Sequence, residues 1–131
     1  MNQVESLQDQ VCLVTGSAQG IGREIVLTLA RHGARVVVNY RTSGAAARAV
    51  ADQVQGLGRE CLIVQADVSR PEEAQRLIDA AAGQWGRIDL LVHNAGPFAL
   101  KPLADTTLEE WHELIGGNLH SAFYCAKFAL P

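Results

Sequence analysis

The chain has 131 residues, which is enough for one domain with a hydrophobic core. Hydrophobic residues make up 48% of it and charged residues 19%, as is typical of a globular protein. With 11 basic and 14 acidic residues the net charge is -3, which argues against a nucleic-acid-binding surface, because such a surface needs a concentrated basic patch.

Nothing in the sequence indicates export, a membrane or a metal. Residues 1–10 are polar and lack the basic-then-apolar order of a signal peptide. No apolar run approaches the ~20 residues that span a bilayer. Cys12, Cys61 and Cys125 lie far apart in apolar segments, which favours buried thiols over a metal or redox site. We therefore expect a cytoplasmic protein without a membrane span or a metal site.

Four short runs are apolar at nearly every position, which is typical of parallel strands that are covered on both faces. In chain order they are Val11–Val14, Val36–Val38, Cys61–Val64 and Ile88–Val92.

A helical pattern follows each run. The first repeats apolar residues every four positions, the second is alanine-rich and ends at glycines, and the third and fourth begin at capping boxes. They cover Ile21–Leu29, Gly44–Gln55, a segment from Ser69 with Glu72 and Pro71, and a segment from Thr107 with Glu110 that continues to Leu119.

Strands that alternate with helices of this length indicate right-handed crossovers and a parallel, doubly wound sheet. We predict a single α/β domain of the Rossmann type over residues 1–131, with strand order 3-2-1-4.

A ligand crevice is expected above the carboxyl ends of the first and fourth strands, where the strand order reverses. Two small-residue loops fall there, Thr15–Gly22 and Asn94–Gly96. Gly16 allows a tight turn, Gly20 lets the backbone approach a pyrophosphate, and Gly22 lets the helix pack closely on the sheet. The helix N-terminus offers free N–H groups to phosphates. No Gly-Lys-Ser/Thr follows these glycines, which disfavours a mononucleotide P-loop.

The spacing Thr-Gly-x-x-x-Gly-Ile-Gly in Thr15–Gly22 resembles the cofactor signature of the short-chain dehydrogenases/reductases, and over about residues 7–131 the chain is most similar to the 3-oxoacyl carrier-protein reductase type. Asp67-Val68, Asn94-Ala95-Gly96 and Asn118 follow in the family's order, with His93 where Asn is more usual. The resemblance implies that Asp67 contacts adenine, although Asp67 also suits the start of a turn. It implies that Asn118 interrupts its helix and holds a water in a proton relay, and we expect His93 to be a packed or hydrogen-bonded residue.

The end of the second strand favours NADP(H) over NAD(H). Tyr40 stands where an NAD-selective site carries an acidic residue. Arg41, Thr42 and Ser43 could then meet a 2′-phosphate. Gln19 counts against NADP(H), because many NADP-type members of the family carry a basic residue at this position that would bind the phosphate.

The predicted catalytic residue is Asn118. The predicted cofactor-binding residues are Gly16, Ser17, Gln19, Gly20, Ile21, Gly22, Tyr40, Arg41, Thr42, Ser43, Asp67, Val68, Asn94, Ala95 and Gly96.

The Tyr-x-x-x-Lys of the family's catalytic site is absent, since neither Tyr40 nor Tyr124 has a lysine at the fourth following position. We expect the sequence to be the cofactor-binding half of a longer reductase for a small carbonyl or alcohol substrate, inactive alone. The fourth strand would be an exposed apolar edge, and the resemblance places the last helix in a subunit interface, so we expect a homo-oligomer.

Two alternatives remain. One is a truncated, non-catalytic nucleotide-binding or regulatory module. The other is an S-adenosylmethionine-dependent methyltransferase, which shares the strand-glycine-helix start but is not favoured by the three-residue glycine gap or by Asn-Ala-Gly.

Overall fold

Four parallel strands form one sheet in the order β3-β2-β1-β4, which confirms the predicted order. The computed structural model describes residues 6–131; residues 1–5, part of the stretch predicted to carry no signal peptide, lie outside them. The elements are β1 (Val11–Val14), α1 (Gly20–Arg31), β2 (Arg35–Tyr40), α2 (Gly44–Gly56), β3 (Cys61–Gln65), α3 (Pro71–Trp85), β4 (Leu90–Val92), the 3₁₀ turn η1 (Leu103–Asp105), α4 (Leu108–Ile115), the π-helical turn η2 (Gly116–His120) and α5 (Ser121–Ala129).

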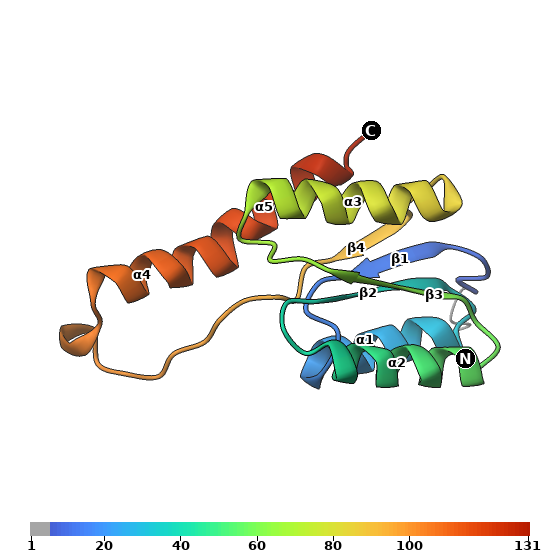
Figure 1. Ribbon diagram of the computed structural model, residues 1–131, viewed down its shortest axis with the longest axis horizontal. Helices are drawn as coiled ribbons and strands as arrows, with labels where there is room; N and C mark the ends of the chain where they lie inside the picture. Colours follow the sequence, from blue (N-terminus) through green and yellow to red (C-terminus); the bar gives the residue numbers. More distant parts are fainter. Residues whose placement is uncertain (1–5) are drawn as a thin grey trace, which may run out of the picture.

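Helices cover both faces of the sheet, with α1 and α2 on one face and α3 and α5 on the other (Figure 1). Successive side chains of β1 point to opposite faces, so Cys12 and Val14 join the α1/α2 core while Leu13 joins the α3/α5 core. Every residue of β1 is buried, as predicted for a strand covered on both sides.

The cysteines belong to this packing. Cys12 and Cys125 are buried and Cys61 is partly buried, and all three are free. Burial raises the pKa of each of these thiols to about 11. The unreactive thiol form therefore dominates near neutral pH, in keeping with a structural role.

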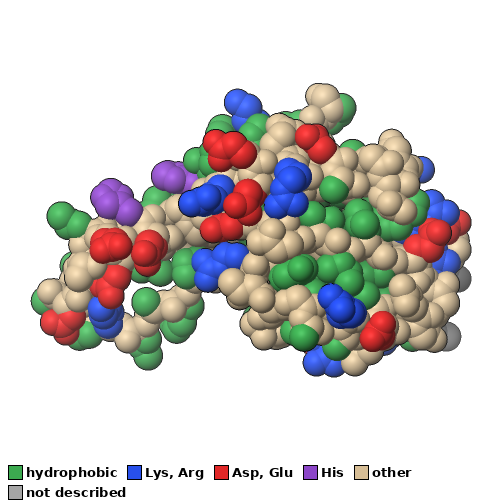
Figure 2. Space-filling view, in the orientation of Figure 1, with side chains coloured by type: hydrophobic (Ala, Val, Ile, Leu, Met, Phe, Trp, Pro, Cys, Tyr) green, Lys and Arg blue, Asp and Glu red, His purple; other side chains and the backbone are tan. Residues whose placement is uncertain are grey.

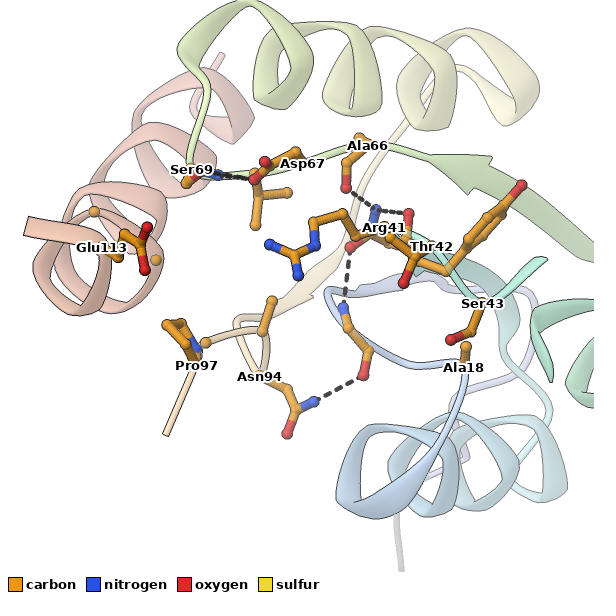
Figure 3. A pocket seen from close by; sticks show the side chains of 18 of the residues that line it. Ala18, Arg41, Thr42, Ser43, Ala66, Asp67, Ser69, Asn94, Pro97 and Glu113 are labelled. Carbon is orange, nitrogen blue, oxygen red and sulfur yellow. Dashed lines mark hydrogen bonds between the residues drawn. The ribbon is translucent and has the colours of Figure 1, made fainter. Parts of the chain in front are cut away.

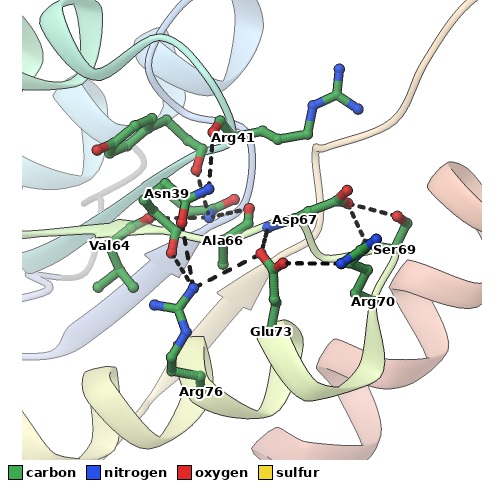
Figure 4. A network of polar contacts seen from close by, with 11 residues as sticks. Asn39, Arg41, Val64, Ala66, Asp67, Ser69, Arg70, Glu73 and Arg76 are labelled. Atoms are coloured by element: carbon green, nitrogen blue, oxygen red, sulfur yellow. Dashed lines mark hydrogen bonds and ion pairs between the residues drawn. The ribbon is translucent and has the colours of Figure 1, made fainter.

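The capping box predicted at the start of the third helix is wrong. Helix α3 begins at Pro71 with Arg70 as its N-cap, and no side chain caps it. The Ser69 hydroxyl instead donates to Asp67 Oδ1 at 2.6 Å, and the carboxylate of Glu73 accepts the N–H of Asp67 at 2.6 Å (Figure 4). Ser69, one of the two side chains expected to cap the helix, is thus held by Asp67, two residues before it.

The second predicted capping box is confirmed. At the start of α4 the Glu110 N–H donates to Thr107 Oγ1 at 3.1 Å, and the Thr107 N–H donates to Glu110 Oε2 at 2.8 Å. With the loop before it, α4 extends away from the sheet (Figure 1).

The last predicted helix is interrupted. Between α4 and α5 the backbone forms the π-helical turn η2, which begins at Gly116 and Gly117. Glycine weakens a regular helix because it loses more backbone entropy than other residues. Within the described part of the chain, no helix is both long and apolar enough to cross a membrane.

Candidate functional site

A pocket of about 1270 Å³ opens above the carboxyl ends of the strands, at the predicted crevice (Figure 3). Figure 2 shows the surface hollowed between the body of the domain and the projecting α4. Most of the predicted cofactor residues line this pocket, namely Gly16, Gln19, Tyr40, Arg41, Thr42, Ser43, Asp67, Val68, Asn94, Ala95 and Gly96.

The remaining predicted residues lie around the pocket rather than on its wall. Ser17 and Gly22 are buried behind it, whereas Ile21 is 76% exposed at the start of α1. Gly20 has a φ of +62°, and a Cβ built there would meet no atom within 4 Å. Asn118 lies on η2, beside the pocket residues Gly116 and Gly117.

Gly16 forms the tight turn that the sequence predicts. Its φ is +60°, in the left-handed region, and an added Cβ would lie 2.9 Å from Ala95 Cα. Thr15 ties this turn to the loop after β4, because its Oγ1 accepts the N–H groups of Asn94 at 2.9 Å and Ala95 at 3.0 Å. The two small-residue loops therefore form one hydrogen-bonded unit.

The close approach predicted at Gly22 is present, but against the glycine loop rather than against a strand. An added Cβ would lie 2.5 Å from Gly16 O, 2.5 Å from Asn94 Nδ2 and 2.9 Å from Ser17 Cα.

Asn39 supports the pocket and was missed by the sequence reasoning. It is 2% exposed near the carboxyl end of β2. Its Oδ1 accepts the Gly16 N–H at 3.0 Å, and its Nδ2 donates to the carbonyls of Val64 and Ala66, both at 3.2 Å (Figure 4). A polar residue near the end of an otherwise apolar run was the available signal.

Ser17 completes this support. Its hydroxyl donates to Val14 O at 2.7 Å and accepts the Asn39 N–H at 3.1 Å. These bonds use the Ser17 hydroxyl inside the protein, where Ser17 is fully buried.

Arg41 reaches into the pocket from the end of β2. Figure 3 shows its side chain extending toward the open space between Asp67 and Asn94, and Figure 4 shows it pointing away from the network around Asn39. The ring of Tyr40, which also lines the pocket, lies against the start of α2: its Cε2 and Oη would be 3.4 Å from a Cβ added to Gly44. Thr42 and Ser43 line the wall next to Arg41.

The carboxylate of Asp67 has a partner of its own. Its Oδ1 accepts the N–H of Ser69 at 3.1 Å and the Ser69 hydroxyl at 2.6 Å, so Asp67 opens a turn, as one of its two sequence interpretations proposed.

Helix α4 supplies a wall that the sequence reasoning did not foresee. Glu109, His112 and Glu113 line the pocket together with Gly116 and Gly117. Acidic side chains gather over this helix in Figure 2. Periodicity predicted the helix but carried no signal that it would face the crevice.

Asn118 is held firmly on η2. Its Nδ2 donates to Pro97 O and to Leu114 O, both at 2.9 Å. Gly96 packs against it, since a Cβ there would collide with Asn118 Oδ1. The predicted interruption of the helix at Asn118 is confirmed, and π-helical turns are frequent at functional sites.

His93 is hydrogen-bonded at the end of β4, and burial lowers its pKa from the ordinary value of 6.5. The unfolded chain therefore binds a proton at higher pH than the folded chain does. The contribution of His93 to stability is complete above pH 6.5 and falls as the pH drops from there toward the lowered value.

We expect the unfolding free energy of the wild type to fall more than that of His93→Gln between about pH 7 and about pH 5, the range in which histidine titrates. Urea unfolding at each pH measures both. Parallel curves for the two proteins would contradict the expectation.

Comparison with known proteins agrees with this geometry. Residues 10–131 match the family model described as short chain dehydrogenase. The chain is 40% identical over 130 residues to the short-chain dehydrogenase/reductase FrzI of Cladobotryum sp., covering 99% of this chain and 50% of that protein. It is 42% identical over 122 residues to the 3-oxoacyl-[acyl-carrier-protein] reductase of Synechocystis sp., covering 93% of this chain and 49% of that protein.

The fold is shared with solved structures. A short-chain dehydrogenase from Burkholderia cenocepacia, crystallised in complex with NADP, superposes with a TM-score of 0.91 at 35% identity, over 94% of this chain and 50% of that one. The chain thus spans about half the length of the relatives it matches.

Proposed function

Because the chain belongs to the short-chain dehydrogenases, we propose that it is the NADP(H)-binding half of an oxidoreductase that transfers a hydride between a nicotinamide cofactor and a carbonyl or alcohol substrate. The observation that carries the proposal is one pocket that joins the glycine turn, the basic end of β2 and the loop after β4. The NADP complex of the Burkholderia relative supports it.

The start of α1 fits a pyrophosphate. No side chain caps this helix and its first turn holds no acidic residue, so its N–H groups and partial positive charge are available to phosphates. The open surroundings of Gly20 leave the backbone accessible at this place.

The end of β2 fits a 2′-phosphate. Arg41 enters the pocket beside the hydroxyls of Thr42 and Ser43, and Tyr40 stands where a carboxylate would repel the phosphate. Asp67, which was predicted to bind cofactor and lines the pocket, already accepts two hydrogen bonds from Ser69 through Oδ1. We therefore propose a preference for NADP(H) over NAD(H).

Arg41→Ala tests this preference. A charge-assisted hydrogen bond is worth about 1.5–3 kcal/mol, so we expect the affinity for NADPH to fall about 10- to 100-fold while that for NADH changes little. Fluorescence titration of the 131-residue chain with each cofactor measures both. Arg48→Ala, an exposed arginine on α2 outside the pocket lining, serves as the matched control. Equal losses of affinity for NADPH and NADH would contradict the proposed preference.

The bound nicotinamide would supply or accept the hydride. We propose that Asn118, fixed by its bonds to Pro97 O and Leu114 O, then holds a water for proton transfer. The chain has no Tyr-x-x-x-Lys, so we expect it to bind NADPH without turning over a carbonyl substrate. Turnover by the 131-residue chain would contradict this division of labour.

Because the relatives are about twice as long, we propose that further residues complete the substrate site. The substrate class that we propose is a 3-oxoacyl compound, as in the name of the Synechocystis relative.

Apolar side chains are exposed along η2 and α5, at Leu119 and Phe123, which are 62% and 60% exposed. We propose that this surface is covered in a homo-oligomer.

A further inference from the structure

His93 connects two sides of the site from the end of β4. Its Nδ1 lies 3.1 Å from Thr15 Oγ1, and its Nε2 lies 3.0 Å from Ser121 Oγ. Both hydroxyl residues are fully buried, whereas His93 is partly buried. Thr15 belongs to the glycine loop, and Ser121 is the first residue of α5. The imidazole therefore spans segments that are far apart in the chain.

The surrounding bonds fix where the imidazole proton lies. Ser121 Oγ is 2.6 Å from Gly117 O, and a carbonyl can only accept, so the Ser121 hydroxyl donates to it. His93 Nε2 must then carry the proton that it donates to Ser121. Thr15 Oγ1 already accepts two backbone N–H groups, so its own proton is directed at the bare Nδ1. The neutral Nε2–H tautomer satisfies every partner.

The π-helical turn explains why Ser121 matters. In an α-helix the Ser121 N–H would donate to Gly117 O, but here it donates to Gly116 O. The Ser121 hydroxyl takes its place at Gly117 O. Asn118 is the next residue, so the bond that holds this carbonyl also holds the backbone that presents Asn118.

We propose that His93 is a positioning residue that, as the neutral Nε2–H tautomer, ties the Thr15 loop and the Asn94-Ala95 turn to the π-helical turn carrying Asn118. Its importance for hydride transfer rests on the proposed function. The hydrogen-bond chain itself is testable without any cofactor.

The first test is nitrogen NMR of the 131-residue chain labelled with ¹⁵N-histidine, with the His93 signal identified by its loss in His93→Gln. Near neutral pH we expect one unprotonated nitrogen, Nδ1, and one protonated nitrogen, Nε2. A protonated Nδ1, or two nitrogens averaged by tautomer exchange, would overturn the proposal.

The second test follows the side-chain amide protons of Asn118, again without cofactor. His93→Phe keeps a ring and removes both nitrogens, and Ser121→Ala breaks the chain at its other end. We expect both variants to shift the Asn118 signals and to speed their exchange about threefold to tenfold, as for one lost hydrogen bond. His32→Gln, an exposed histidine at the end of α1, should leave them unchanged. Unmoved Asn118 signals in both variants would overturn the proposal.

The third test separates positioning from cofactor binding. Ser121→Ala should weaken NADPH binding about threefold to tenfold in the wild-type background and by a smaller factor in His93→Phe, because His93→Phe already lacks the bond to His93 and only the bond from Ser121 to Gly117 O is left to lose. Equal losses in the two backgrounds would overturn the coupling. A different outcome is that neither the wild type nor the variants bind NADPH, while the expected His93 tautomer and the expected Asn118 shifts are both observed. In that case the proposed function fails and the positioning role of His93 stands.

Discussion

Replacing Gly22 with alanine is expected to destabilise the folded chain by about 3 kcal/mol, the upper part of the range for overpacking a rigid core. The added methyl group would lie 2.5 Å from Gly16 O and 2.5 Å from Asn94 Nδ2. Neither atom can retreat cheaply, because Asn39 holds the Gly16 backbone and Asn94 Nδ2 itself donates to Gly16 O at 3.0 Å. NADPH binding should fall with stability, since Gly16 and Asn94 both line the pocket.

Urea unfolding of the variant measures the loss. Gly83→Ala provides the control, because a Cβ on Gly83, inside α3, would meet no atom within 4 Å. There the loss of backbone freedom in the unfolded chain dominates, and we expect a gain of about 0.5–1 kcal/mol. If the two glycine variants had the same stability, the close packing at Gly22 would not be the cause.

The order of elements could be predicted because it depends on local pattern. The apolar run Val11–Val14 had to be covered on both faces, and it lies at the centre of the sheet. The turn at Gly16 followed from its place between a strand and a helix, and its positive φ confirms it. Helix and strand boundaries shifted where capping and pairing decided them, so β2 extends through Tyr40 and β4 shrinks to Leu90–Val92.

The capping box at Ser69 and Glu72 failed for a physical reason. Asp67 and Glu73 offer carboxylates to the same short segment, and Ser69 bonds to Asp67 rather than to the helix backbone. A motif read from spacing alone does not weigh such competing acceptors. The Thr107 box was predicted correctly: Thr107 Oγ1 accepts the Glu110 N–H, and Glu110 accepts the Thr107 N–H through Oε2 while its other oxygen, Oε1, accepts from Lys101.

The support of the site could not be read from the sequence, because its bonds join distant residues. Thr15, His93 and Ser121 meet only after the sheet has formed. Sequence periodicity does not indicate which distant residues will form hydrogen bonds. It likewise does not indicate that Glu113 lines the pocket, because this depends on the direction in which α4 extends from the sheet. Local spacing therefore predicted the two small-residue loops at the crevice, while tertiary contacts decide what holds them.

Asn39→Asp is expected to lower the unfolding free energy by about 3–4 kcal/mol, because it disrupts the buried hydrogen bonds that hold the site. The change preserves the shape of the side chain and the bond from the Gly16 N–H. It replaces the Nδ2 that donates to Val64 O and Ala66 O with an acceptor oxygen facing two other acceptors. A buried carboxylate would also have to ionise where the wild type is 2% exposed.

The pH dependence of this loss identifies its cause. Burial raises the pKa of the new carboxyl above its unfolded value, so the loss is full above the folded pKa and shrinks as the pH falls toward the unfolded value. Urea unfolding from about pH 7 down to about pH 4 follows it, since an unperturbed Asp titrates near the lower end of that range. Gln53→Glu, the same amide-to-carboxylate change on the exposed face of α2, should cost under about 0.5 kcal/mol. A loss at position 39 as small as that at position 53 would mean that the Asn39 bonds do not hold the pocket, because a buried donor pair cannot be lost at so low a cost.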